Sequence, residues 1–140
     1  MRVRHIMTKG ADYVAPSCGL REAARKMKQH NVGTLPVCEK DVLVGIITDR
    51  DIVVRALSED AELDDVRVGQ IMTTNPTRCY QEAEIGGVAR IMEERKIRRM
   101  PVVDRDERLV GVLSVDDFTQ RDASSGFAAE ILRATAAHHI

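Results

Sequence analysis

The sequence predicts an α/β protein made of two tandem β-α-β-β-α repeats that pack about a pseudo-twofold axis. A repeated motif, apolar residues at helical spacing and a doubled strand pair all support this prediction. The tripeptide Ile-Met-Thr stands at residues 6–8 and again at 71–73, an offset of 65 positions. At the same offset, Leu-Pro-Val at 35–37 is matched by Met-Pro-Val at 100–102. Because this register holds over many apolar positions, we interpret the chain as a duplication.

Each repeat has the same predicted elements in the same order. A short extended stretch follows Ile-Met-Thr, and a helix comes next, because apolar residues recur every three or four positions. These apolar residues are Leu20, Ala23, Ala24 and Met27 in the first repeat and Ile85, Val88, Ala89 and Met92 in the second. Two strands joined by a polar turn follow the helix, as in "TLPVCE" and "VLVGIIT", and a second helix begins at the Thr or Ser that ends the strand.

Four segments are expected along the chain. Residues 1–57 form repeat 1, and an acidic linker occupies residues 58–67. Repeat 2 covers residues 68–120, and residues 121–140 form a C-terminal tail with a predicted helix from residue 127 onward. Each repeat is too small to bury much apolar surface alone, so we expect the two to pack against each other.

Composition narrows the class of protein. The 140 residues carry a formal net charge of −1, and this balance argues against a nucleic-acid binder. Aromatic residues make up only 3%, so the core should be aliphatic. Cys18, Cys38 and Cys79 form no Cys-x-x-Cys spacing, which makes a disulfide framework improbable. We find no signal-peptide pattern and no apolar run long enough for a membrane span, and we therefore expect a cytoplasmic protein without membrane contact.

The pattern Gly-x-x-Thr/Ser-x-x-Asp occurs twice and carries the functional hypothesis. It places Thr48 three residues before Asp51, and Ser114 three residues before Asp117. One interpretation is structural, because a hydroxyl and an acid at this spacing form a capping box at a helix start. The other is functional. Backbone N–H groups and a hydroxyl at a helix start suit phosphate, and a carboxylate one turn further on can accept the hydroxyls of a ribose.

The doubled "IMT … LPV/MPV … LVG-x-x-T/S-x-x-D" pattern resembles a pair of cystathionine-β-synthase (CBS) domains, called a Bateman module. The resemblance covers residues 3 to about 118. It implies a regulatory protein, usually a homodimer, that binds AMP, ADP, ATP, NAD(H) or S-adenosylmethionine in the cleft between the repeats. It also implies that the hydroxyl contacts phosphate and that the carboxylate holds the ribose.

Carried over position by position, the resemblance implies one site with Thr48 and Asp51 and another with Ser114 and Asp117. The first-strand positions that would flank adenine are Tyr13, Val14, Arg78 and Cys79. The positions that would supply apolar walls are Leu35, Pro36, Met100 and Pro101.

The two implied sites differ in charge. Gly33 and Thr34 precede Leu-Pro-Val in repeat 1, whereas Arg98 and Arg99 precede Met-Pro-Val in repeat 2. Because a guanidinium group can bind phosphate with two hydrogen bonds, we expect the stronger nucleotide site in repeat 2. The alternative is that residues 94–99 are only a solvated charge run.

No motif for catalysis is found, so an enzyme is not expected. His5, His30, His138 and His139 show no metal-ligand spacing, and adenine nucleotide without metal is the expected ligand. The leading hypothesis is a stand-alone nucleotide sensor that signals to an unknown protein effector. The alternatives are an interaction or scaffold protein with empty sites, and a redox- or metal-responsive module.

Overall fold

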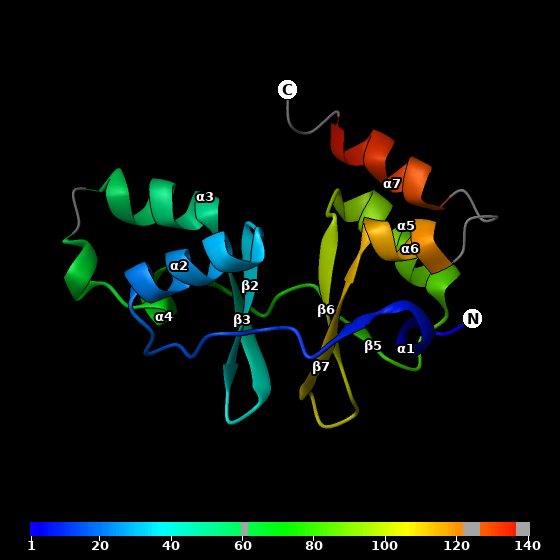
Figure 1. Ribbon diagram of the computed structural model, residues 1–140, viewed down its shortest axis with the longest axis horizontal. Coiled ribbons are helices and arrows are strands. Elements are labelled where there is room, and N and C mark those ends of the chain that lie inside the picture. The colour runs from blue at the N-terminus through cyan, green and yellow to red at the C-terminus, as the bar shows by residue number, and fades with distance from the viewer. Residues whose placement is uncertain (60–61, 122–126, 137–140) are drawn as a thin grey trace. The chain divides into compact units, whose positions relative to one another are not determined.

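The computed structural model describes residues 1–59, 62–121 and 127–136, and the chain divides into two compact units (Figure 1). Unit 1 consists of Met1–Ala11 together with Thr77–Ile140, and unit 2 consists of Asp12–Pro76. Each unit combines one small sheet with helices, as the sequence predicts. The pseudo-twofold packing of the repeats stays a prediction.

Unit 2 contains a three-stranded sheet of strand order β2-β3-β4, in which both pairings are antiparallel. Its strands are β2 (Thr34–Glu39), β3 (Val42–Thr48) and β4 (Thr73–Thr74). Its helical segments are α2 (Leu20–His30), α3 (Asp49–Asp51), the π-helical η1 (Ile52–Leu57), the 3-10 turn η2 (Leu63–Asp65) and α4 (Val68–Ile71). In its core, apolar side chains of α2 pack against those of β2 and β3.

Unit 1 contains a four-stranded sheet of strand order β1-β7-β6-β5, in which the β5–β6 pair is parallel. Its strands are β1 (Thr8–Lys9), β5 (Cys79–Tyr80), β6 (Arg99–Val103) and β7 (Leu109–Ser114). Its helices are α1 (Val3–Ile6), α5 (Ile85–Arg95), α6 (Val115–Arg121) and α7 (Phe127–Ala136). The helix predicted in the C-terminal tail is therefore present.

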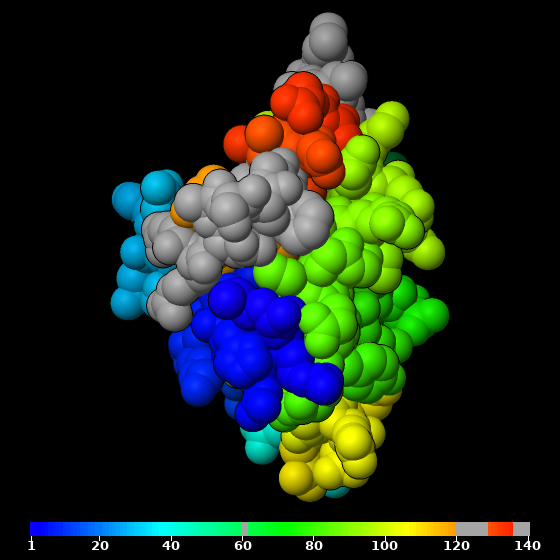
Figure 2. All heavy atoms as spheres, turned by 90° about the vertical axis from the view of Figure 1, so that its right-hand side faces the viewer, coloured from blue at the N-terminus to red at the C-terminus, as the bar shows by residue number. Residues whose placement is uncertain are grey.

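The two Ile-Met-Thr segments pack on the opposite repeat from the one that contains them in sequence. Thr8 of repeat 1 pairs with Val112 of β7, and Thr73 of repeat 2 pairs with Ile46 of β3. The N–H of Val3 also donates to the carbonyl of Ala83 at 2.9 Å. In Figure 2 the N-terminal residues, in blue, lie against the green residues of unit 1. We call these two exchanged segments the arms (residues 1–11 and 68–76). The repeat boundaries in the sequence follow the duplication, whereas the boundaries of the compact units follow the exchange of the arms.

Two strand glycines allow the arms to approach the sheets closely. A Cβ atom on Gly45 would lie 2.9 Å from the carbonyl oxygen of Thr73, and one on Gly111 would lie 2.7 Å from that of Thr8. These distances are too short for any side chain, so both positions require glycine. Close approach of another backbone segment is a common reason for glycine inside a strand.

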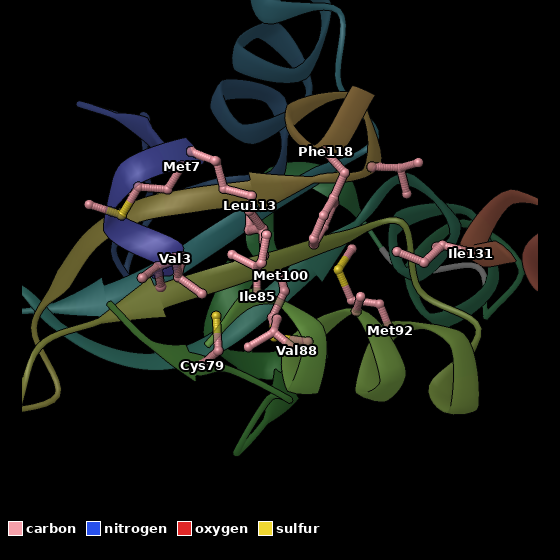
Figure 3. Packing of buried hydrophobic residues seen from close by; sticks show 14 residues of the cluster. Val3, Met7, Cys79, Ile85, Val88, Met92, Met100, Leu113, Phe118 and Ile131 are labelled. Carbon is pink, nitrogen blue, oxygen red and sulfur yellow. The ribbon is translucent and has the colours of Figure 1, made fainter. Parts of the chain in front are cut away.

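The core of unit 1 is aliphatic except for Phe118, in agreement with the low aromatic content. Met100 of β6 and Leu113 of β7 have no exposed surface, and the side chains of Met92 and Phe118 cover them from α5 and α6 (Figure 3). Ile131 of α7 is also fully buried in this cluster. Across the residues described, none of the helices has the length and apolar character needed to span a membrane.

Candidate functional site

In unit 2, the Thr-x-x-Asp motif forms a compact corner where β3 runs into α3. The hydroxyl of Thr48 accepts a hydrogen bond from the N–H of Asp51 at 3.0 Å, and the N–H of Thr48 donates to Oδ2 of Asp51 at 3.0 Å. Both bonds of a capping box are therefore present. The carboxylate of Asp51 is almost completely buried, although its Oδ1 lies 3.6 Å from Nε of Arg55.

The remaining backbone donors at the start of α3 are used within the protein. The N–H of Asp49 donates to the carbonyl of Gly33 at 2.9 Å, and the N–H of Arg50 donates to Oδ1 of Asp49 at 2.8 Å. The carboxylate of Asp49 also fills the space beside Gly33, where a Cβ atom would lie 2.8 Å from Oδ2. The corner of unit 2 therefore has the carboxylate of Asp49 beside Gly33 and the guanidinium group of Arg55 beside Asp51.

The equivalent corner of unit 1 joins β7 to α6. The N–H of Ser114 donates to Oδ2 of Asp117 at 2.8 Å, and its hydroxyl lies 3.3 Å from the same oxygen. The hydroxyl of Thr8 donates to Oδ1 of Asp117 at 3.3 Å, across 109 positions of sequence. Asp117 is thus a nearly buried carboxylate that two hydroxyls and a backbone N–H surround.

This geometry serves both interpretations of the motif. An ionised carboxylate has about four acceptor positions, so hydrogen bonds of the capping box do not exhaust it. The two hydroxyl contacts of Asp117 are long, and a hydroxyl can rotate toward a new partner. A vicinal diol could therefore bind at Asp117 while the backbone N–H of Ser114 keeps the carboxylate in place.

Thr8 was not among the residues predicted from the sequence. Its place in the arm brings it to the corner of the other repeat, and only the tertiary structure shows this exchange. The one signal in the sequence is that Thr ends both copies of Ile-Met-Thr, at Thr8 and at Thr73.

Val14 and Cys79 lie beside the strands that carry the predicted apolar walls. The N–H of Val14 donates to the carbonyl of Pro36 at 3.1 Å, and Cys79 pairs in parallel with Val102, next to Pro101. Both side chains point into the cores, because only 4% and 5% of their surfaces are exposed. The backbone N–H and carbonyl of Val14 are also paired within the sheet, because Cys38 donates to that carbonyl at 2.9 Å. A contact between these two residues and a ligand stays a prediction.

Tyr13 and Arg78 occupy equivalent positions, and both side chains reach the hairpin turns. The hydroxyl of Tyr13 donates to Oδ1 of Asp41 at 2.9 Å, and Nη1 of Arg78 lies 3.4 Å from Oε2 of Glu107. These turns are at the opposite end of the hairpins from Thr48 and Ser114. The structure therefore does not bring these two side chains to the corners, and their role beside adenine stays a prediction.

The predicted apolar walls are buried. Leu35 and Met100 are 2% and 0% exposed and belong to the two cores, where they support the sheets. Pro36 and Pro101 follow them in β2 and β6 and are also buried. A contact between these residues and a ligand stays a prediction.

Arg98 and Arg99 lie at the corner of unit 1. The carbonyl of Arg98 accepts the N–H of Val115 at 3.0 Å, and Arg99 pairs with Ser114 at the end of the hairpin. Gly33 makes the equivalent backbone contact in unit 2. The same backbone position therefore carries a guanidinium group at one corner and no side chain at the other.

The cysteines are poorly suited to redox chemistry. All three are free, and burial raises the pKa of Cys38 to about 11 and that of Cys79 to about 12. Burial, together with the carboxylate of Glu22, raises the pKa of Cys18 to about 11. Because the thiolate is the reactive form, these thiols should react slowly near neutral pH.

Among the residues that the structure describes, no three side chains of His, Cys, Asp or Glu are placed to hold a metal ion. His138 and His139 lie outside the described residues.

Comparison with known proteins establishes the family. The family model that describes CBS domain sequences matches residues 3–58 and 68–124. The chain therefore belongs to the CBS domain family and carries two of its repeats. The CBS domain-containing protein YhcV of Bacillus subtilis is 34% identical over 134 residues, which span 93% of this chain and 91% of that protein.

Solved structures of similar proteins contain adenosyl ligands. CBSX2, solved in complex with AMP, has 28% identity and a TM-score of 0.74, and the match covers 85% of this chain and 93% of that one. The CBS domain pair of protein MJ0100, solved with 5′-methylthioadenosine and S-adenosyl-L-methionine, has 31% identity and a TM-score of 0.72, with coverages of 86% and 94%.

A third structure corrects the expectation about metals. Hypoxic Response Protein I was solved with two coordinated zinc ions, and it is 32% identical to this chain with a TM-score of 0.79. The match covers 86% of this chain and 98% of that one. The expectation that adenine nucleotide without metal accounts for the ligands of such a protein is therefore wrong. The spacing of histidines along a sequence is a poor guide to metal binding, because metal ligands need not be neighbours in sequence and come together only on folding.

Proposed function

We propose that this protein is a regulatory module that binds an adenosyl nucleotide, with its main site at the corner of unit 1. The observation that carries the proposal is the environment of Asp117, a nearly buried carboxylate with Ser114, Thr8 and two arginines at the same corner. AMP bound to CBSX2 and the adenosyl ligands bound to MJ0100 support this class of ligand.

Each residue has a distinct role in the proposed complex. Asp117 accepts hydrogen bonds from the ribose hydroxyls, and the hydroxyl of Ser114 donates to a phosphate oxygen. Arg98 and Arg99 balance the phosphate charge, since a planar guanidinium group can donate two parallel hydrogen bonds. Ligands with this chemistry include AMP, ADP, ATP and NAD(H).

The corner of unit 2 is the weaker site for a phosphorylated ligand. It lacks both arginines, and the carboxylate of Asp49 lies against Gly33, the position equivalent to Arg98. A phosphate there would approach the carboxylate of Asp49 and be repelled by it, while the guanidinium group of Arg55 is already paired with Asp51. We therefore propose one tight AMP site per chain.

Regulation requires that the ligand prefers one arrangement of the module over another. A protein effector or a second copy of the chain would respond to that arrangement. Affinities between millimolar and micromolar, about −4 to −8 kcal/mol, would let occupancy follow cellular adenylate levels.

Isothermal calorimetry with AMP tests the proposal, and Asp117→Ala and Asp51→Ala form a matched pair. Each substitution removes the carboxylate that accepts the backbone N–H of the Thr or Ser three residues earlier, so their effects on stability should be similar, about 1 kcal/mol. We expect Asp117→Ala to weaken AMP binding by about tenfold or more, because a hydrogen bond to a charged group is lost. Asp51→Ala should leave the AMP affinity within about twofold of the wild-type value.

A thermal-shift series with AMP, ATP and NADH completes the test. Stabilisation that grows with ligand concentration is expected for a ligand that binds only the folded state. If none of the three nucleotides shifts the transition at millimolar concentration, the motifs are helix caps only and the scaffold interpretation holds.

A further inference from the structure

Helix α7 packs on the helical face of unit 1, and a polar contact joins it to the corner. Ile131 and Thr135 have no exposed surface, and Ile131 belongs to the core cluster that contains Met92 and Phe118 (Figure 3). The hydroxyl of Thr135 accepts a hydrogen bond from Nε of Arg98 at 2.9 Å. The same hydroxyl lies 3.1 Å from the carbonyl of Ile131, to which it can donate.

The chemistry of Thr135 makes it a fixed acceptor for Arg98. A threonine hydroxyl has one proton and two lone pairs, and its proton is directed to a carbonyl within α7. Its lone pairs therefore face the guanidinium group. Because the side chain is fully buried and the helix is packed, the oxygen has little freedom to move.

Arg98 keeps its charge and most of its donors in this arrangement. Thr135 is neutral, and among the described residues no carboxylate forms an ion pair with Arg98. A guanidinium group has five N–H donors, of which Thr135 takes the one on Nε. Within the described part of the chain, no group accepts a hydrogen bond from the two terminal nitrogens, so their four donors can bind an anion, and the residue itself is exposed.

Unit 2 has no counterpart of this contact among the described residues. There, a hollow of about 450 Å³ lies between α2 and η1, and Met27, Ile52, Gly33 and Asp49 are among the residues that line it. Met27 and Ile52 are the repeat equivalents of Met92 and Phe118, which lie beside α7 in unit 1. The helix and the arginine therefore occur together at one corner, and the other corner has neither.

We propose that Thr135 is a positioning residue for Arg98, and that α7 thereby makes the corner of unit 1 selective for phosphorylated adenosyl ligands over the free nucleoside. This inference depends on the proposed function. A long arginine side chain loses much conformational freedom when it binds a phosphate, and an anchor on Nε removes part of that cost before the ligand arrives. Adenosine has no phosphate, so its affinity should not depend on the anchor.

The test compares AMP with adenosine by calorimetry on the full chain. Thr135→Val removes the hydroxyl and keeps the shape of the side chain. We expect AMP affinity to fall about threefold to tenfold, the loss typical of one orienting hydrogen bond, and adenosine affinity to stay unchanged. Thr135→Ser keeps the hydroxyl and should restore the wild-type ratio of the two affinities.

Arg98→Lys provides a second route that leaves the core under α7 intact. It preserves the charge but loses Nε and the planar donor group, so the ratio of AMP to adenosine affinity should fall as it does in Thr135→Val. In Arg98→Ala, the further change Thr135→Val should have no effect on that ratio.

Three outcomes separate the possible failures. Equal losses for AMP and adenosine in Thr135→Val would overturn the inference, because they indicate a structural role only. The inference would also be overturned if AMP binds but the ratio of AMP to adenosine affinity is unchanged in both Thr135→Val and Arg98→Lys. The proposed function would then still stand. Absence of binding by either compound to the wild-type chain would overturn the proposed function itself.

Discussion

At the scale of single residues, the glycines of the chain differ in what they tolerate. A Cβ atom on Gly111 would lie 2.7 Å from the carbonyl oxygen of Thr8 and 2.9 Å from Sδ of Met7. The backbone oxygen cannot move without displacing the arm, whereas the methionine side chain can. Gly87 lies inside α5, and a Cβ atom there would meet nothing within 4 Å.

Gly111→Ala and Gly87→Ala should therefore have opposite effects on stability. We expect Gly111→Ala to lower the free energy of unfolding by about 1–3 kcal/mol, because the extra carbon is forced against backbone. Gly87→Ala should raise it by about 0.5–1 kcal/mol, because alanine favours the helix and restricts the unfolded chain. Urea denaturation measures both values. A stabilised Gly111→Ala variant would show that the arm does not need this close approach.

At the scale of secondary-structure elements, the arms are the least self-sufficient parts of the fold. Helices α1 and α4 have four residues each, and β1 and β4 have two. Segments this short do not fold alone, so tertiary packing must hold them in place. Ile6 is 1% exposed in the core of unit 1, and Ile71 is 7% exposed in the core of unit 2.

Ile6→Ala should weaken unit 1 even though Ile6 belongs to repeat 1 in sequence. Loss of a buried isoleucine typically costs about 2–5 kcal/mol, and the cavity would lie under the sheet of unit 1. Hydrogen exchange should show faster exchange of backbone amides in β6 and β7, with β2 and β3 unchanged. Ile71→Ala is the matched control and should show the reverse. If Ile6→Ala accelerated hydrogen exchange mainly in β2 and β3, the assignment of residues 1–11 to unit 1 would be wrong.

At the scale of the whole molecule, η1 of unit 2 carries apolar side chains that are exposed in the described part of the chain. Val53, Val54 and Leu57 expose 54%, 44% and 56% of their surfaces. Contiguous exposed apolar residues often mark an interface with another protein chain. The homodimer stays a prediction from the sequence, and in a dimer of closed twofold symmetry this surface would lie against a second copy of the chain.

Light scattering at a fixed protein concentration and a fixed ionic strength tests whether the chain forms this dimer. We expect twice the mass of one chain for the wild type and a shift toward the mass of one chain for Val54→Glu, because a charge would be buried in the interface. Val54 is exposed in the single chain, so this substitution should leave the fold intact. A wild-type mass equal to one chain would contradict the homodimer.

The fold could be predicted from the sequence to a large extent, because the signals are local and occur twice. Helical spacing predicts α2 and α5, and the paired apolar runs predict the hairpins β2–β3 and β6–β7. The corners could be predicted for the same reason, since a hydroxyl and a carboxylate three residues apart adopt capping geometry wherever a helix follows a strand.

By itself, the sequence determined the two repeats, the order of their elements, and the pairs Thr48–Asp51 and Ser114–Asp117. Only the tertiary structure decided that the arms exchange, that Thr8 contacts Asp117, and that Thr135 accepts a hydrogen bond from Arg98. It also decided that Leu35 and Met100 are buried in the cores and that Tyr13 reaches a hairpin turn. The physical reason is the distance along the sequence between the residues that interact. Capping and periodicity depend on residues a few positions apart, whereas these contacts depend on which distant segments bury the most apolar surface together.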